Sequence, residues 1–341
     1  MKCFLVGLFG LVTLTSALPL TSLQQDFAEY FADLINRINA LNATWKAGPN
    51  FAGETVQSVL DRIGPAEVDF PPPEEKPSLP AVVHDVDIPK EFDARKNWPQ
   101  CPSIGRISDQ GRCRSYWAFA AVGMIDDRFC ISQGVHVNIS AEDALSCSED
   151  MQKNGCAGGR PSIALDSWSK QGLVTGGAFN SNAGCRPYPY KPCDHHEKGT
   201  YGPCTAPPSL TFCDKICRAG YPKEYNQDKH YGSVYSVDHS EESIQKEIMT
   251  NGSVTTYIVV YQDFPIYRSG VYRHTSDKAI GRSALKILGW GDEGDQKYWL
   301  CANSWNTEWG DKGFIKILRG INECQIEETV MAGTPQKPGT W

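Results

Sequence analysis

The chain has 341 residues, of which 40% are hydrophobic and 11% aromatic, and this composition is sufficient for a sizeable buried core. It contains 33 basic and 40 acidic residues, so the formal net charge is −7. This balance provides no basic surface for nucleic acid or anionic lipid, and it argues against both kinds of partner. The length fits one two-lobed domain with additional removable segments.

The N-terminus has the pattern of a secretory signal. Lys2 precedes an apolar run at 4–14, and Thr15-Ser16-Ala17 supplies the small residues of a cleavage site. The apolar run is shorter than the about 20 residues that a membrane span requires. We therefore predict a signal peptide over residues 1–17, and we predict no membrane span in the rest of the chain.

The signal directs the chain to an oxidising compartment, which is either the lysosome or the extracellular space. Of the 13 cysteines, Cys3 lies in the signal segment and 12 remain. In this compartment we expect them to form disulfides rather than to bind metal, and we predict no metal and no other cofactor. Three sequons are candidate glycosylation sites on the same route, at Asn42, Asn138 and Asn251.

Residues 18–87 differ from the segment that follows. Apolar residues recur at helical spacing from Phe27 to Leu41 and predict one amphipathic helix. The proline-rich run at 71–77 should be extended, exposed and open to proteases. The segment is either a small helical subdomain or a pro-segment that is removed near Ile88, and we predict the pro-segment.

The remaining chain, 88–341, divides into a helical half and a β half. The uncharged stretch 117–125 and its continuation to Cys130 predict a helix buried on nearly all sides. Residues 185–217 hold five cysteines among many prolines and glycines and predict loops joined by disulfides. Four short runs predict antiparallel strands, at 254–261, 284–290, 298–302 and 314–318. Together these halves predict an α+β fold with two lobes and a cleft between them.

Residues 109–119 resemble the nucleophile loop of the papain family of cysteine proteases. In that family a glutamine lies six residues before the catalytic thiol, a disulfide-forming cysteine lies three before it, and Trp-Ala-Phe follows. Gln110, Cys113 and Trp117 stand at these offsets, which fixes the register. The position of the catalytic cysteine is occupied by Tyr116.

The resemblance is to the cathepsin B branch of the family and extends from about residue 41 to residue 333. Residues 88–95 are similar to the start of the mature enzyme. Gly158 and Gly159 end a segment similar to the glycine strip that lines the substrate cleft, and His195 and His196 resemble the tip of the occluding loop. The resemblance implies a helical left lobe, a right lobe like an antiparallel β-barrel, and an occluding loop around 185–217.

The resemblance also implies a role for each position of the catalytic machinery. Hydrolysis in this family needs a thiolate at a helix N-terminus, an imidazole base, an amide that orients the base, and donors for the oxyanion. Gln110 matches the oxyanion donor and Asn303 the orienting amide, whereas Ser283 stands at the position of the base. A phenol has a pKa of about 10, against about 8.5 for a free thiol, and Ser283 cannot accept its proton. We expect the ring of Tyr116 to project into the cleft and partly fill the oxyanion site.

Three further positions bear on what the cleft would bind. In the family the two histidines at 195 and 196 hold the C-terminal carboxylate of a substrate, although a solvated loop tip is the simpler interpretation. Tyr201 stands where the family has an arginine that fixes this loop to the acid at Glu308, so we expect a less firmly closed loop. Thr329 replaces a glutamate at the base of the main specificity pocket, which would remove a preference for basic side chains.

The family's cysteine pairing implies five disulfides. They are Cys101–Cys130, Cys113–Cys156, Cys147–Cys213, Cys185–Cys217 and Cys193–Cys204. Cys301 and Cys324 are left over, and Cys301 lies in a strand pattern that predicts a buried, unreactive thiol.

Three functions follow from these observations. The first is a catalytically inactive cathepsin B-like protein whose cleft still binds peptides, protein substrates or cystatin-like inhibitors. The second is an active endopeptidase or dipeptidyl carboxypeptidase with relocated catalytic groups, for which Ser115 and His196 are the candidates. The third is a structural extracellular protein, which would show no saturable binding of peptides or cystatins.

Overall fold

The structure is a computed structural model, and it describes residues 20–65, 87–148, 155–196, 199, 201–204 and 212–337. The predicted signal peptide at 1–17 and the proline-rich run at 71–77 lie outside these ranges. In the parts of the chain that the structure describes, no helix combines the length and the apolar character needed to cross a bilayer.

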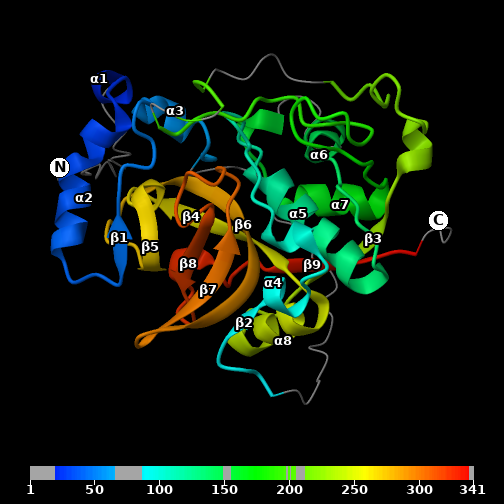
Figure 1. Cartoon of the computed structure of the whole chain (residues 1–341). Helices are drawn as coiled ribbons and strands as arrows, with labels where there is room; N and C mark the ends of the chain where they lie inside the picture. Colours follow the sequence, from blue (N-terminus) through cyan, green and yellow to red (C-terminus); the bar gives the residue numbers. More distant parts are fainter. Residues whose placement is uncertain are drawn as a thin grey trace, which may run out of the picture.

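Three helices form the core of the helical lobe (Figure 1): α5 (Tyr116–Gln133), α6 (Ala141–Cys147) and α7 (Pro161–Lys170). As predicted, α5 is buried along nearly its whole length, because it packs against both other helices and against the sheet. The helix ends where Gly134 adopts the left-handed conformation, with φ of 67°, that favours glycine after a helix.

The second lobe is built on one sheet. Among the described residues, nine strands pair in the order β1-β5-β8-β7-β6-β4-β9-β3, and β2 joins at β6. The strands are β1 (Trp45–Ala47), β2 (Phe92–Asp93), β3 (Gly232–Ser236), β4 (Val254–Tyr261), β5 (Tyr267–Tyr272), β6 (Ala279–Glu293), β7 (Gln296–Ala302), β8 (Phe314–Leu318) and β9 (Met331–Pro335).

The four predicted strands are all present in this sheet. β4 and β8 have the predicted bounds, whereas β6 and β7 are longer than predicted. The expectation of antiparallel pairing holds for β4, β6, β7 and β8, but β5 and β8 pair in parallel. The hairpin of β6 and β7 separates these two strands in the chain, so β8 returns to the edge beside β5 in the same direction. The sheet is therefore mixed.

The remaining helices are short, apart from α2 and α8. They are α1 (Leu20–Leu23), α2 (Phe27–Ala40), α3 (Val56–Leu60), α4 (Ala94–Asn97) and α8 (Glu241–Asn251), with 3-10 turns η1 (Pro102–Gly105), η3 (Gly155–Ala157), η4 (Tyr225–Asp228), η5 (Phe264–Ile266) and η6 (Glu323–Gln325). The described part of 185–217 contains no helix or strand, as its composition predicts.

Most of the N-terminal segment, residues 20–65, packs against the sheet lobe, and its helix α2 and strand β1 lie on the side of the molecule away from α7 (Figure 1). The helix predicted from Phe27 onward is α2, which buries Phe27, Phe31 and Ile38 in the core of that lobe. Leu41, expected on the same apolar face, is 56% exposed because the helix ends at Ala40. The strand β1 then pairs antiparallel with β5, so this segment extends the sheet.

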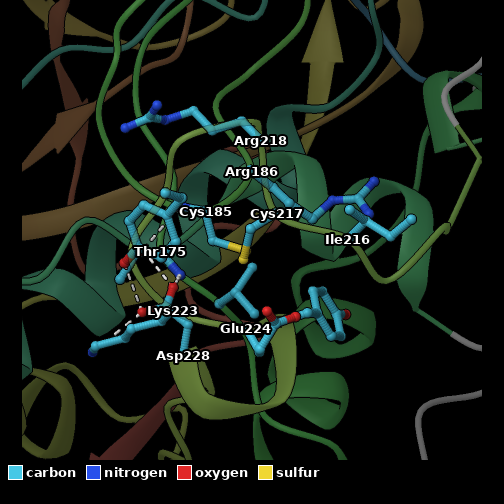
Figure 2. The surroundings of a disulfide bond; sticks show 12 residues. Thr175, Cys185, Arg186, Ile216, Cys217, Arg218, Lys223, Glu224 and Asp228 are labelled. Carbon is cyan, nitrogen blue, oxygen red and sulfur yellow. Dashed lines mark hydrogen bonds and ion pairs between the residues drawn. A yellow bond between two sulfur atoms is a disulfide. The ribbon is translucent and has the colours of Figure 1, made fainter.

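All five predicted disulfides are present, and Cys301 and Cys324 are free and buried. Figure 2 shows the Cys185–Cys217 bridge at the base of the loop region. Beside it, the buried carboxylate of Asp228 accepts hydrogen bonds from the backbone N–H of Thr175 (2.8 Å) and from its hydroxyl (2.5 Å). The backbone N–H of Cys185 in turn donates to the carbonyl of Thr175 (2.9 Å), which ties the bridge to this network.

Two acidic residues near the middle of α5 are buried, and each has a partner. Asp127 accepts from the ammonium of Lys286 on β6 (2.8 Å) and thereby joins the two lobes. Asp126 forms an ion pair with Arg106 and accepts from the backbone N–H of Ile139 (2.8 Å). Despite these partners, burial raises the pKa of Asp126 to about 6.

We expect Asp126 to make stability depend on pH. The unfolded carboxyl has a pKa of about 3.9, so the folded state holds the proton more tightly. This contribution is complete below the unfolded pKa and is lost as the pH rises through about 6. The free energy of unfolding of the wild type relative to Asp126→Asn should therefore fall by about 2 kcal/mol between pH 4 and pH 7. Urea denaturation at several pH values measures this difference, and a constant or rising difference would contradict the prediction.

Candidate active site

Tyr116 begins α5 and is completely buried. Its hydroxyl lies against two glycines that come from different parts of the chain. A Cβ on Gly64 would overlap the hydroxyl oxygen, and a Cβ on Gly158 would lie 2.8 Å from it. The phenol therefore fills a space that exists because neither glycine has a side chain.

Burial raises the pKa of the Tyr116 phenol well above its usual range, and interaction with Tyr257 raises it further. Tyr257 lies on β4, and the guanidinium groups of Arg160 and Arg282 lie 5.9 Å and 5.5 Å from the centre of its ring. The predicted specificity residue Thr329 is close by, since its hydroxyl donates to the carbonyl of Tyr257 (3.4 Å).

The N-terminal segment crosses between the two lobes at this point. The N–H of Gly64 donates to the carbonyl of Arg282 (2.8 Å), and the N–H of Arg282 donates back to the carbonyl of Gly64 (3.0 Å). Ser283, the next residue on β6, is completely buried, and its hydroxyl has no hydrogen-bond partner among the described residues. Gly64 thus lies between Tyr116, at the predicted nucleophile position, and the strand that carries Ser283.

Gln110 is bound by the same N-terminal segment. Its side-chain N–H group donates to the carbonyls of Arg62 (2.9 Å) and Cys113 (2.7 Å), and its oxygen accepts from the hydroxyl of Ser304 (2.8 Å). The amide expected to stabilise an oxyanion therefore contacts a carbonyl of the segment. The Tyr116 hydroxyl lies against Gly64 and Gly158, and the expectation that its ring partly fills the oxyanion site stays a prediction.

Asn303 follows β7 and lies in the same region. Its side-chain oxygen accepts from the N–H of Ser304 (2.8 Å), whereas its side-chain nitrogen is buried without a partner among the described residues. In the helical lobe, Gly159 packs so closely on α5 that a Cβ at this position would lie 2.8 Å from the ring of Trp117. The structure thus brings the predicted residues from both lobes to one place.

His195 is not at a solvated loop tip. It is completely buried, its ring packs on Phe51 at 4.6 Å between centroids, and its backbone N–H donates to Glu308 (2.6 Å). Burial lowers the pKa of His195 well below its usual range, and the charge of Arg62 lowers it further. His196 is half-buried. The solvated-tip interpretation fails for His195 because the N-terminal segment covers the loop.

The same segment contributes residues that the sequence did not indicate. Arg62, which is completely buried, makes two hydrogen bonds to Glu54 (2.7 Å and 2.9 Å). It also lies 2.9 Å from Cys204 and 3.3 Å from Cys193, the two sulfurs of the loop disulfide. The sequence pattern around Arg62 does not indicate its role, because that role arises from contacts with distant segments. The same holds for Tyr257 on β4.

A cavity of about 310 Å³ opens between the lobes beside this site. Its lining includes Phe119 of α5, Asn303 and Asn306 after β7, and Tyr201 of the loop region. Asn306 donates to Asp109 (2.9 Å) and to the carbonyl of Cys193 (3.0 Å), so the loop forms one wall of the cavity. The cavity offers both aromatic and amide groups to a ligand.

Comparison with known proteins identifies the family of the chain. The sequence profile described as "Papain family cysteine protease" matches residues 88–334. The chain belongs to the papain family of cysteine proteases. Within this family it is 41% identical over 336 residues to a cathepsin B-like cysteine proteinase of Schistosoma japonicum, with 96% of this chain and 97% of the relative covered.

Two further comparisons place the chain in the same branch of the papain family. It is 48% identical over 258 residues to cathepsin B-like cysteine proteinase 6 of Caenorhabditis elegans, covering 74% of this chain and 68% of the relative. The solved structure of proCathepsin B S9 from Trypanosoma congolense superposes with a TM-score of 0.75 at 32% identity and covers 89% of this chain and 98% of that one. The predicted papain-like fold is confirmed.

The contact between Gly64 and Tyr116 can be tested by substitution. Gly64→Ala places a methyl group on the phenol oxygen and should lower the free energy of unfolding by about 1–3 kcal/mol. In a Tyr116→Cys background the same substitution should cost clearly less, because the ring is absent. Chemical denaturation of the two single variants and the double variant measures this coupling.

Gly105→Ala is the matched control for that cycle. The nearest atom to its new methyl group, at 3.4 Å, belongs to the flexible side chain of Arg95, so the stability should change little in either background. Equal costs of Gly64→Ala with and without the Tyr116 ring would refute the contact.

Proposed function

We propose that this papain-family protein is catalytically inactive and that its cleft binds peptides, protein substrates or cystatin-like inhibitors. One observation carries the proposal: a buried phenol, that of Tyr116, lies at the start of α5, where the family places its thiol. The opposing position on β6 carries Ser283, which has no basic group.

Hydrolysis of this kind needs an electron pair on the nucleophile and an acceptor for its proton. The pKa of the Tyr116 phenol is raised by burial, so very little phenolate is present at the pH of a lysosome or of the extracellular space. A serine hydroxyl at the base position cannot take the phenol's proton. In a serine protease the loss of nucleophile or base lowers turnover by about 10⁶-fold, and the same logic predicts a rate near background.

An active peptidase with relocated groups is the alternative, and the names of the two relatives as cysteine proteinases favour it. Ser115, one candidate nucleophile, is completely buried, and its hydroxyl lies 2.6 Å from that of Tyr188. Burial raises the pKa of Tyr188 well above its usual range, so it cannot serve as a base. The other candidate is His196, and no contact among the described residues places a nucleophile beside it.

We further propose that the chain follows the secretory route, with a signal peptide at 1–17, a pro-segment at 18–87 and the papain-like domain at 88–341. Asn42 and Asn251 are exposed, which supports their glycosylation, whereas Asn138 is half-buried and its carbonyl accepts from Gly176. Without activity of its own, the protein would require another protease for cleavage near Ile88.

Restoring both replaced positions tests the proposal of inactivity. The purified chain, after cleavage of residues 66–86 by an added protease, should not hydrolyse peptidyl or dipeptidyl reporter substrates. The variant Tyr116→Cys with Ser283→His should hydrolyse them at least about 10²-fold faster, with sensitivity to thiol alkylation, because it regains the ion pair. Tyr116→Cys alone is the control and should stay near background. Alkylation-sensitive turnover by the wild type would refute the proposal.

Binding separates the proposed function from a purely structural role. Calorimetry with a cystatin should give saturable binding in the micromolar range or tighter once the N-terminal segment has left the cleft. The uncleaved chain is the control and should bind much more weakly, because residues 62–64 occupy the cleft. Absence of saturable binding in both forms would favour the structural role.

A further inference from the structure

We infer that His274, Glu323 and Cys324 form a binding site for one divalent metal ion of the zinc type, apart from the candidate active site. The three residues come from two segments: His274 follows β5, and the other two lie in η6. One ligand atom of each, the His274 Nδ1, a Glu323 oxygen and the Cys324 Sγ, lies within 4.8 Å of the others. This inference departs from the expectation that the cysteines of this chain have no role in metal binding.

The distances suit a single central ion. The Glu323 Oε1 lies 2.6 Å from the His274 Nδ1 and 3.4 Å from the Cys324 Sγ. Around one tetrahedral zinc, with each ligand atom about 2.0–2.3 Å from the metal, the ligand atoms lie about 3.3–3.7 Å apart. The separation of oxygen and sulfur fits this range, whereas that of oxygen and nitrogen is a hydrogen-bond contact that must widen by about 0.7 Å. Only a small opening of the contact between imidazole and carboxylate would admit the ion.

The surroundings already hold the ligands in place. The His274 ring stacks on Tyr261 with 4.0 Å between the ring centroids and 9° between the planes. The backbone N–H of His274 donates to the Glu323 Oε1 (3.0 Å), which orients the carboxylate. Contacts of this kind around the first ligands fix their geometry before the metal binds.

The charge at this site also favours a cation. Glu323 and Cys324 are 4% and 3% exposed. Burial and the negative charge of Glu323 raise the pKa of the Cys324 thiol well above its usual range, and Asp263 adds to this effect. An activated nucleophilic thiol needs the opposite, a positive environment, so this pair of thiol and imidazole is not a relocated catalytic dyad.

The donor set indicates the class of metal. Sulfur, imidazole nitrogen and carboxylate oxygen together suit a borderline ion such as Zn²⁺ rather than Ca²⁺ or Mg²⁺. On binding, the metal–sulfur bond replaces the sulfur–hydrogen bond, and one proton is released to solvent for each ion. The His274 side chain is 29% exposed, which leaves a side of the site open for water as a fourth ligand.

The site is connected to the cleft through Gln325 and Arg282. Gln325, next to Cys324, accepts a hydrogen bond from Arg282 (2.7 Å), and Arg282 pairs with Gly64. A bound ion would therefore stiffen η6 next to the segment that holds the N-terminal chain in place. The role that follows is structural.

Cobalt titration of the full-length protein tests the inference, because Co²⁺ bound to a thiolate gives a charge-transfer absorption band. We expect one equivalent to bind with this band, and Zn²⁺ to displace it. Adding Zn²⁺ directly to the metal-free protein should release one proton in weakly buffered solution. Cys324→Ala should abolish the band. His274→Phe, which keeps a ring on Tyr261, and Glu323→Gln, which keeps the acceptor, should each weaken binding at least 10-fold.

Cys301→Ala provides the matched control. Cys301 is also a free and completely buried thiol, but burial alone raises its pKa, so no charged or imidazole partner marks it as a ligand. This variant should bind Co²⁺ as the wild type does. The inference is overturned if the wild type shows no thiolate–cobalt band at micromolar Co²⁺ after overnight equilibration. A band that survives Cys324→Ala, or one lost in Cys301→Ala, also overturns it.

Discussion

The contact of the Tyr116 phenol with Gly64 and Gly158 is the constraint on which the rest of the site depends. It joins the first turn of α5, the N-terminal segment and the glycine strip in one closely packed point. Because a buried phenol needs this space, both glycines are required, and the chain at residues 62–64 lies where it can bond to Gln110 and Arg282. The phenol of Tyr116 thus also shapes how the N-terminal segment closes the cleft.

The same closure explains the environment of the loop at 185–217. Arg62 and Phe51 from the N-terminal segment cover the Cys193–Cys204 bridge and the ring of His195. Arg62 is tolerated in this buried place because Glu54 neutralises its charge through two hydrogen bonds. Removal of this segment would uncover His195 together with Gln110, so the binding that we propose for the cleft depends on the loss of residues 20–65.

The sequence predicted the elements with strong local signals. The α5 helix and the strands β4 and β8 follow from uncharged or alternating runs, because such runs are stable only where they are buried. The parallel pairing of β5 and β8 was not predictable, since no local pattern reports which edge a strand joins. The exposure of Leu41 was missed for a similar reason: its spacing fits α2, but the helix ends one residue earlier.

By itself the sequence supplied the prediction that Tyr116 and Ser283 stand at the positions of nucleophile and base, because the resemblance to the family sets the register around both residues. It also determined the five disulfides through the family's pairing. Only the tertiary structure decided where the phenol points, which carbonyls accept from the Gln110 side chain, and that His195 is buried. It alone brought His274 to Glu323 and Cys324. These contacts join segments far apart in the chain, and their energies come from shared burial, which no local pattern records.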